Sequence, residues 1–174
     1  MDEVITVDIF DNPIGTMEKL AAHRKPTLHR AFSVFLVDGD YMLIQKRALN
    51  KYHSGGLWAN SCCSHPRPNM PFDQSVKNRI ELELGITTPL HLTEIFNFTY
   101  LSKYAEDLFE YEYDHVLVGN YDRTQQINFN PEEIAEVKWV KISDLQKDLV
   151  NNPTNYSTWF LICAPKVIKY LQTN

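Results

Sequence analysis

The chain has 174 residues, of which 44% are hydrophobic and 12% are aromatic, and its formal net charge is −5. This length and composition predict a single globular domain over residues 1–174 that buries about two-thirds of its unfolded surface. The acidic balance argues against a nucleic-acid partner, because phosphate recognition needs a basic surface. No run of about 18 or more apolar residues is present to cross a membrane, and the acidic N-terminus lacks the basic start of a signal peptide.

These features predict a cytoplasmic protein whose three cysteines, Cys62, Cys63 and Cys163, stay reduced. Two adjacent cysteines have a poor geometry for a disulfide with each other. No glycine-rich dinucleotide fingerprint is present, so we expect neither a flavin nor a nicotinamide cofactor. A monomer is favoured over an oligomer.

The N-terminal half alternates apolar strand patterns with one short helical pattern. In chain order, it predicts a strand at 4–10, a turn at 11–15 and a helix at 17–25. Three further strands are predicted at 31–37, 41–47 and 57–63. Pro26 is expected to end the helix. An Asp-Gly turn between the second and third strands predicts a hairpin.

The C-terminal half predicts a helix at 72–85, followed by three strands at 91–101, 108–121 and 136–142. Two helices are predicted after them, at 143–150 and 156–171. The first helix is the clearest, since its apolar residues recur at helical spacing and Gly85 is placed to cap its end. Pro165 is expected to interrupt the last helix. Strands and helices therefore mix, which predicts an α+β fold with a mixed sheet between helices.

The stretch EYEYD at 110–114 places three carboxylates on one face of its strand, because side chains alternate along a strand. These are Glu110, Glu112 and Asp114. A solvated sheet face is one interpretation. The other is a divalent metal site, since carboxylates about 6–7 Å apart along one face can converge on a cation. No ligand role is assigned to Asp114.

The stretch NSCCSHP at 60–66 allows three interpretations: a fragment of a zinc site, a buried pair of small residues, or a reactive thiol beside a metal ligand. No second cysteine pair is present, which disfavours a structural zinc site. In an extended segment Cys63 and His65 face one way and Cys62 faces the other, toward the core. His23 and His29 bracket the entry to the strand at 31–37. Three histidines and two glutamates make a ligand set suited to zinc, manganese or iron.

The helix at 72–85 carries Arg79 and Glu83 four residues apart on one face. They can form an ordinary ion pair, worth about 0.2–0.5 kcal/mol. Alternatively, Glu83 binds a second cation and Arg79 an anionic substrate. Lys19, Arg47 and Lys51 flank the same loops and support an anion pocket, although each alone is typical of a surface charge.

Several motifs resemble the type I isopentenyl-diphosphate isomerases of the Nudix fold, in order and over nearly the whole chain. GTMEKLAAH at 15–23 is similar to the family's N-terminal segment, and LHRAFSVF at 28–35 to the segment that follows it. QKRALNKYHSGGLWANSCCSHP at 45–66 resembles the central block. ELELG at 81–85 and EYEYDHV at 110–116 resemble the family's helix end and its E-x-E strand.

The resemblance implies an α/β/α sandwich around a mixed sheet and the conversion of isopentenyl diphosphate to dimethylallyl diphosphate. It implies one divalent metal (manganese, zinc or magnesium) bound by His23, His29, His65, Glu110 and Glu112. It implies Cys63 and Glu112 as the catalytic pair, and Glu83 at a magnesium that also binds the diphosphate. The implied substrate-binding residues are Lys19, Arg47, Lys51, Ser64, Arg79, Tyr100 and Trp159.

Parts of the sequence also fit two alternative functions. A Nudix pyrophosphohydrolase carries the box R-E-U-x-E-E-x-G, in which U is aliphatic. Here the window 78–85 keeps only Ile80, Glu83 and Gly85, while two acidic positions have become Arg79 and Leu82. This degenerate box predicts weak hydrolysis at best. The second alternative is a non-catalytic metal-binding or interaction module. The chain also departs from the isomerase pattern, with Ser64 where the family often has glycine and with a shorter interval between His23 and His29.

Overall fold

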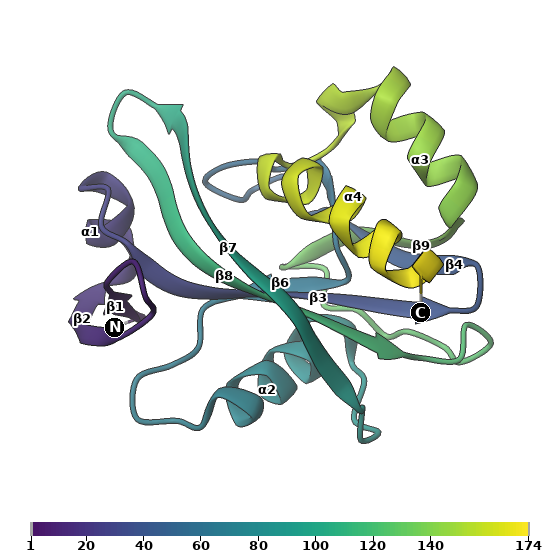
Figure 1. Cartoon of the computed structure of the whole chain (residues 1–174), viewed down its shortest axis with the longest axis horizontal. Coiled ribbons are helices and arrows are strands. Elements are labelled where there is room, and N and C mark those ends of the chain that lie inside the picture. Colours follow the sequence, from purple (N-terminus) through teal and green to yellow (C-terminus); the bar gives the residue numbers. More distant parts are fainter. Residues whose placement is uncertain (1, 174) are drawn as a thin grey trace.

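The computed structural model describes residues 2–173, which form one mixed sheet with helices on both of its faces (Figure 1). The strands are β1 Glu3–Val7, β2 Pro13–Glu18, β3 His29–Asp38, β4 Tyr41–Arg47, β5 Trp58–Ala59, β6 Cys62–Ser64, β7 Leu92–Ala105, β8 Leu108–Asn120 and β9 Ile134–Lys141. The helices are α1 Lys19–Arg24, α2 Phe72–Leu84, α3 Ile142–Asn151 and α4 Thr158–Thr173, with a 3-10 turn at Pro153–Asn155.

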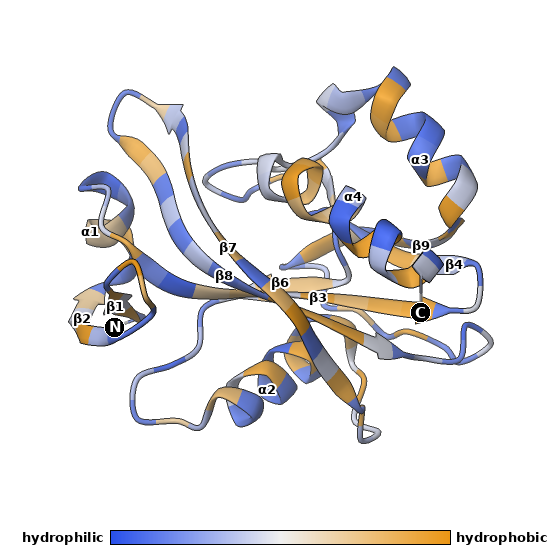
Figure 2. Cartoon of the chain, viewed as in Figure 1, coloured by the Kyte–Doolittle hydropathy of each residue, from blue (hydrophilic) through white to orange (hydrophobic). Residues whose placement is uncertain are grey.

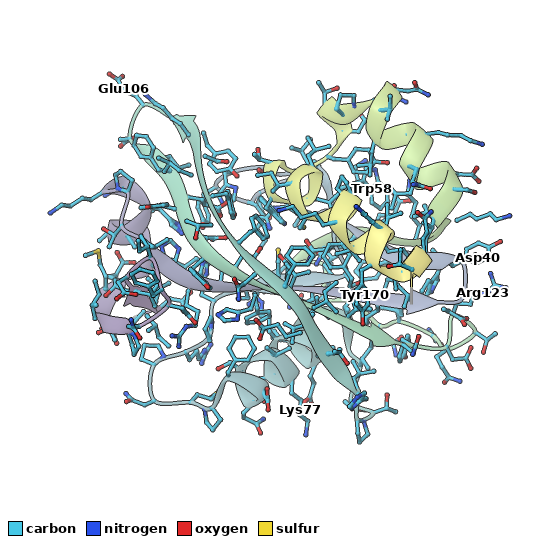
Figure 3. The ribbon with its side chains drawn as sticks, viewed as in Figure 1. Asp40, Trp58, Lys77, Glu106, Arg123 and Tyr170 are labelled. Carbon is cyan, nitrogen blue, oxygen red and sulfur yellow. The ribbon has the colours of Figure 1, made fainter. Side chains whose placement is uncertain are left out.

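Strand β3 lies at the centre of the sheet and has the most varied partners. It runs parallel to β8, with His29 opposite Glu112, and antiparallel to β1, β4 and β6. β8 pairs along its length with β7 in a long hairpin, and β4 pairs with β5 and β9. Glu106 lies at the tip of the β7–β8 hairpin, which extends beyond the rest of the sheet (Figure 3).

The side chains of β3 alternate between two hydrophobic layers, which explains why the strand is an almost continuous apolar run (Figure 2). Phe32, Val34 and Leu36 pack with α2 in one cluster. Phe35 and Val37 pack with α4 in the other. The predicted α/β/α sandwich around a mixed sheet is therefore confirmed.

Helix α2 ends as its sequence predicts. Gly85 adopts a left-handed conformation with φ of 68°, and its N–H donates to the carbonyl of Glu81. Val76, Ile80 and Leu84 are buried against the sheet, whereas Lys77 points away from it (Figure 3).

Several predicted elements differ in the structure: the strand predicted at 4–10 ends at Val7, and the strand predicted at 57–63 is divided into β5 and β6 by Asn60 and Ser61. Residues 13–15 of the predicted turn and residues 17–18 of the predicted helix belong instead to β2, because Met17 and Glu18 pair with Val4 and Glu3 of β1. Pro13 fits there as the first residue of an edge strand. The helix begins only at Lys19, where the Glu18 carboxylate accepts from the N–H groups of Leu20 and Ala21.

The prediction that Pro165 interrupts the last helix is wrong, since α4 continues through it from Thr158 to Thr173. Proline removes one backbone hydrogen bond from a helix interior. Here the buried residues on both sides of Pro165, such as Phe160 and Val167, hold α4 against the sheet. Among residues 2–173, no helix combines the length and the apolar character needed to cross a bilayer.

Candidate active site

A pocket opens between the sheet, the β4–β5 loop, α2 and the start of α4. Most of the residues singled out in the sequence line it: Lys19, Arg47, Lys51, Cys63, Ser64, His65, Arg79, Glu83, Tyr100, Glu110, Glu112 and Trp159. His23 and His29 lie behind this wall and are fully buried. The fold thus gathers residues from every part of the chain into one site.

Four of the five predicted metal ligands form a compact group. His23 comes from α1, His29 from the start of β3, His65 from just after β6, and Glu112 from β8. The Nε2 atom of His29 is 3.2 Å from the Nε2 atoms of both His23 and His65. Oε1 of Glu112 is 2.8 Å from Nε2 of His65 and 3.7 Å from that of His29.

These spacings suit a shared cation. Ligand atoms about 2.1 Å from one ion lie about 3.0–3.4 Å from each other. Nδ1 of His29 is 2.8 Å from the carbonyl oxygen of Thr27, so this nitrogen carries a proton and Nε2 is the atom that faces the group. Nδ1 of His23 is 3.0 Å from the Tyr52 hydroxyl. The donor set therefore fits a divalent metal such as zinc or manganese.

Burial and charge set the protonation of this group. Burial lowers the pKa of His23 to about 3 and that of His65 to about 4, so both rings are neutral at pH 7. Burial also opposes charge on His29 and Glu112, but their mutual attraction outweighs it. The pKa of His29 is raised and that of Glu112 is well below its ordinary value. Neutral imidazole and ionised carboxylate are the forms that bind metals, so His29 would release a proton when a cation binds.

Glu110, the fifth predicted ligand, lies beside this group but outside it. Its Oε1 is 2.7 Å from Nε2 of His53. Its Oε2 accepts from the hydroxyls of Tyr100 and Tyr104, each at 3.0 Å. The Tyr100 hydroxyl is also 2.6 Å from Oε2 of Glu112, so its single proton is shared between the two carboxylates.

The two adjacent cysteines separate as the strand alternation predicts. Cys63 lines the pocket and is the direct cross-strand partner of Ser33. Cys62 is fully buried in the cluster beneath α2. Removal from water raises the pKa of the Cys63 thiol above its ordinary value, so the sulfur carries its proton at neutral pH.

One end of the pocket is rich in basic residues, which are held by carboxylates. Arg79 donates to Glu83 through Nε and to Glu133 through Nη2, both at 2.5 Å. Lys51 donates to the same Glu133 oxygen at 2.6 Å. Gln45 donates to the second oxygen of Glu83 at 2.9 Å. This network fixes the basic groups before any anion enters.

Trp159, at the start of α4, forms an aromatic wall of the pocket. Its indole Nε1 donates to Oδ1 of Asn60 at 3.0 Å, which fixes the plane of the ring. The guanidinium carbon of Arg47 lies 5.1 Å from the ring centroid. The indole is only 3% exposed, so its face is largely removed from water.

Asp114, for which the sequence indicates no role, is buried next to the pocket rather than in its lining. Its Oδ2 accepts from the Ser33 hydroxyl at 2.8 Å, and its Oδ1 has no partner among residues 2–173. Burial raises its pKa well above the ordinary value. The carboxyl is therefore held neutral in the interior.

The chain is similar to known proteins over nearly its whole length. Residues 27–160 match the NUDIX domain family. Isopentenyl-diphosphate Delta-isomerase 2 of Aromatoleum aromaticum is 41% identical over 174 residues, covering 99% of this chain and 90% of the relative. The protein of the same name from Photorhabdus laumondii is 43% identical, with coverages of 92% and 89%. The chain belongs to the isopentenyl-diphosphate Delta-isomerase family.

The family identification agrees with the architecture. A crystal structure of a Deinococcus radiodurans protein has a TM-score of 0.70, at 17% identity, and covers 87% of this chain and 90% of that chain. At this identity the likeness shows the Nudix fold alone. The resemblance to this isomerase family that the sequence shows is confirmed by the family match and the relatives. The predicted fold of this isopentenyl-diphosphate Delta-isomerase family member is confirmed as well.

Sequence reasoning missed several residues that line the same pocket: Ser33, Gln45, Tyr52, His53 and Glu133. Tyr52 and His53 directly follow Lys51, a predicted substrate-binding residue, but nothing in the local pattern marks them. A buried histidine in a short loop looks like any other polar loop residue until its partner, Glu110, is known.

Proposed function

We propose that this protein isomerises isopentenyl diphosphate to dimethylallyl diphosphate, a step of isoprenoid biosynthesis. The observation that carries the proposal is the joint placement of Cys63 and Glu112 in one pocket with a basic end. Relatives about 40% identical over nearly the whole chain are named for this reaction. The substrate is a small molecule, and we place the enzyme in the cytoplasm as a monomer.

The reaction adds one proton to the terminal alkene carbon and removes another from carbon 2. Atoms balance without oxidation, reduction or hydrolysis. Cys63 and Glu112 are the proposed pair of proton carriers, one on each side of the substrate. The neutral thiol can donate, and the carboxylate beside Tyr100 can accept. A single positioned acid or base contributes about 10²–10⁴-fold, so other effects must add to it.

A divalent metal (manganese, zinc or magnesium) is proposed at His23, His29, His65 and Glu112, with Glu110 as a fifth ligand. When bound, it supplies positive charge that tunes the basicity of the carboxylate in a water-poor site. The chain's own contribution is to fix the donors. The His29–Thr27 hydrogen bond and the His23–Tyr52 contact orient two of the imidazoles.

The basic end of the pocket is the proposed diphosphate site. Lys19, Arg47, Lys51 and Arg79 would bind the phosphates, with Ser64 nearby and a magnesium ion at Glu83. The diphosphate does not react, so its binding serves to orient the alkene between the two proton carriers. Lys51 and Arg79 both contact Glu133, which keeps these two side chains in place for the diphosphate.

Protonation of an alkene builds positive charge on carbon. Trp159 and Tyr100 supply aromatic surface for that charge, and a desolvated indole face is worth about 2 kcal/mol or more toward a cation. Both side chains are at least nine-tenths buried. They also exclude water, which would otherwise capture the cation.

A Nudix pyrophosphohydrolase is the alternative function. Those enzymes use several glutamates of one helix to assemble magnesium. On α2, Glu83 is buried and bound to Gln45, while Leu82 is half exposed at a position where the box has a glutamate. Arg79 at another acidic position is neutralised by Glu83 and Glu133. This helix favours binding of a diphosphate over its cleavage.

The deciding experiment is an assay of the purified protein with isopentenyl diphosphate and magnesium in deuterated water. Deuterium in a dimethylallyl product supports the isomerase. Release of phosphate supports the hydrolase instead. If neither product forms, the remaining interpretation is a non-catalytic metal-binding module.

A further inference from the structure

His53 is a buried histidine for which the proposed reaction has no use. It lies in the loop between β4 and β5, and only 2% of its side chain is exposed, next to a Glu110 side chain that is 6% exposed. Its Nε2 is 2.7 Å from Oε1 of Glu110. Ser54 Oγ is 3.2 Å from the other ring nitrogen, Nδ1. A serine that donates to Nδ1 leaves the Nε2–H directed at Glu110.

Aromatic rings hold the imidazole of His53 in this orientation. Tyr104 stacks on it, with ring centroids 4.4 Å apart and an interplanar angle of 23°. Trp159 and Tyr52 meet it edge to face, at 5.9 Å and 4.5 Å. A ring packed on three sides cannot turn without disturbing the pocket wall, so its N–H is a fixed donor.

Both oxygens of the Glu110 carboxylate therefore have hydrogen-bond partners. His53 faces Oε1, while Oε2 accepts from Tyr104 and shares the single Tyr100 proton with Glu112. The Tyr100 hydroxyl continues to Oε2 of Glu112, whose Oε1 contacts His65. A continuous series of contacts within hydrogen-bond distance, in which Tyr100 shares one proton between Glu110 and Glu112, therefore links His53 to the group of His23, His29, His65 and Glu112.

We propose that His53 is a positioning residue of the metal site, which sets the orientation of the Glu110 carboxylate so that Glu110 binds the cation together with His23, His29, His65 and Glu112. Hydrogen bonds to ligating carboxylates are worth about 10–100-fold in metal affinity. The proposal rests on the proposed metal site. Its test needs no substrate, so it can fail while the isomerase assay succeeds, and the reverse.

The test measures the dissociation constant for Mn²⁺ of the metal-free full chain, by electron paramagnetic resonance of the free ion. His53→Phe keeps the stacking on Tyr104 but removes the N–H, and we expect Mn²⁺ to bind about 10–100-fold more weakly. His53→Gln restores a donor near the Nε2 position and should recover most of the affinity. The matched control is His91→Phe, at an exposed position outside this pocket. Thermal unfolding of each metal-free variant checks that it is folded.

A double-mutant cycle tests whether His53 acts through Glu110. In a Glu110→Gln background, His53→Phe should change the Mn²⁺ dissociation constant by less than about twofold, because the carboxylate to be positioned is gone. The proposal is overturned by an undiminished affinity of the His53→Phe variant, by a tighter one, or by a full loss in the Glu110→Gln background. Failure of the unaltered protein to bind Mn²⁺ would overturn it as well.

Discussion

Cys62 and Cys63 are neighbours in the chain, yet their side chains lie in opposite layers of the molecule. The Cys62 side chain is fully buried under α2 among Val76, Ile80 and Leu84. The Cys63 side chain faces the pocket that contains Glu112 and Trp159. One residue of strand alternation thus separates a core side chain from a proposed proton carrier.

The cysteine pair supplies its own matched control. Cys63→Ala should lower kcat by at least about 10²–10⁴-fold, because one of the two proton carriers is lost. Cys62→Ala should keep its activity and lose about 1–2 kcal/mol of stability, since it removes a buried sulfur. Steady-state kinetics and thermal unfolding of both variants measure this. An inactive Cys62→Ala beside an active Cys63→Ala would show that the assignment is reversed.

Metal removal should destabilise the fold, since the four residues of the metal group come from α1, β3, the segment after β6, and β8. An ion at a concentration about 100 times its Kd stabilises a protein by about 2.7 kcal/mol, which corresponds to a rise in Tm of about 5–10 °C for a chain of this size. Differential scanning fluorimetry with and without chelator measures the rise. It should vanish in His29→Ala and persist in His115→Ala, whose imidazole pairs instead with Asp11 and Glu94. A persistent rise in His29→Ala would contradict the metal group.

The stability of the metal-free protein should fall as the pH falls from about 6.5 to about 4. In the unfolded chain His23 and His65 take up protons near the ordinary histidine pKa of 6.5, but in the fold their pKa values are about 3 and about 4. The unfolded state therefore binds more protons over this interval, and each group costs about 1.4 kcal/mol per pH unit. His29, whose pKa is raised, is protonated in both states at the lower end of this interval. The raised pKa of Asp114 acts in the opposite direction and partly offsets the contribution of the two histidines. Urea unfolding at several pH values measures the slope, and a flat profile would refute the expectation.

Trp159→Phe should lower kcat by about tenfold, with a smaller effect on KM. A phenyl face stabilises a cation less than an indole face does, and the hydrogen bond to Asn60 is lost. The matched control is Trp139→Phe, because Trp139 packs on the α2 side of the sheet. An equal loss of kcat in both variants would point to a general structural effect instead of charge stabilisation in the pocket.

The sequence predicts most of this fold because its strands and its α2 helix have strong local patterns. The apolar residues of β3 and the spacing of Val76, Ile80 and Leu84 on α2 indicate buried faces without any knowledge of partners. The β2 strand has no such pattern, since Pro13–Glu18 is largely exposed and forms only by pairing with β1. The persistence of α4 through Pro165 likewise depends on the core that α4 covers.

The residues of the site also differ in whether the local sequence marks them. Cys63, His65 and Glu112 are recognisable because their residue types are rare together and their motifs are specific. His53 and Glu133 are not, because each acquires its place through a partner far along the chain, Glu110 for the first and Arg79 for the second. The local sequence pattern does not predict such contacts between distant residues.

The charges around α2 also constrain the evolutionary routes open to this molecule. Arg79 is shared by Glu83 and Glu133, and Lys51 completes the balance. Arg79→Glu would leave three negative side chains against one lysine, a mutual repulsion that this substitution alone cannot relieve. Restoring a row of acidic side chains on α2 would therefore require further substitutions that rebalance the charge around Glu83 and Glu133.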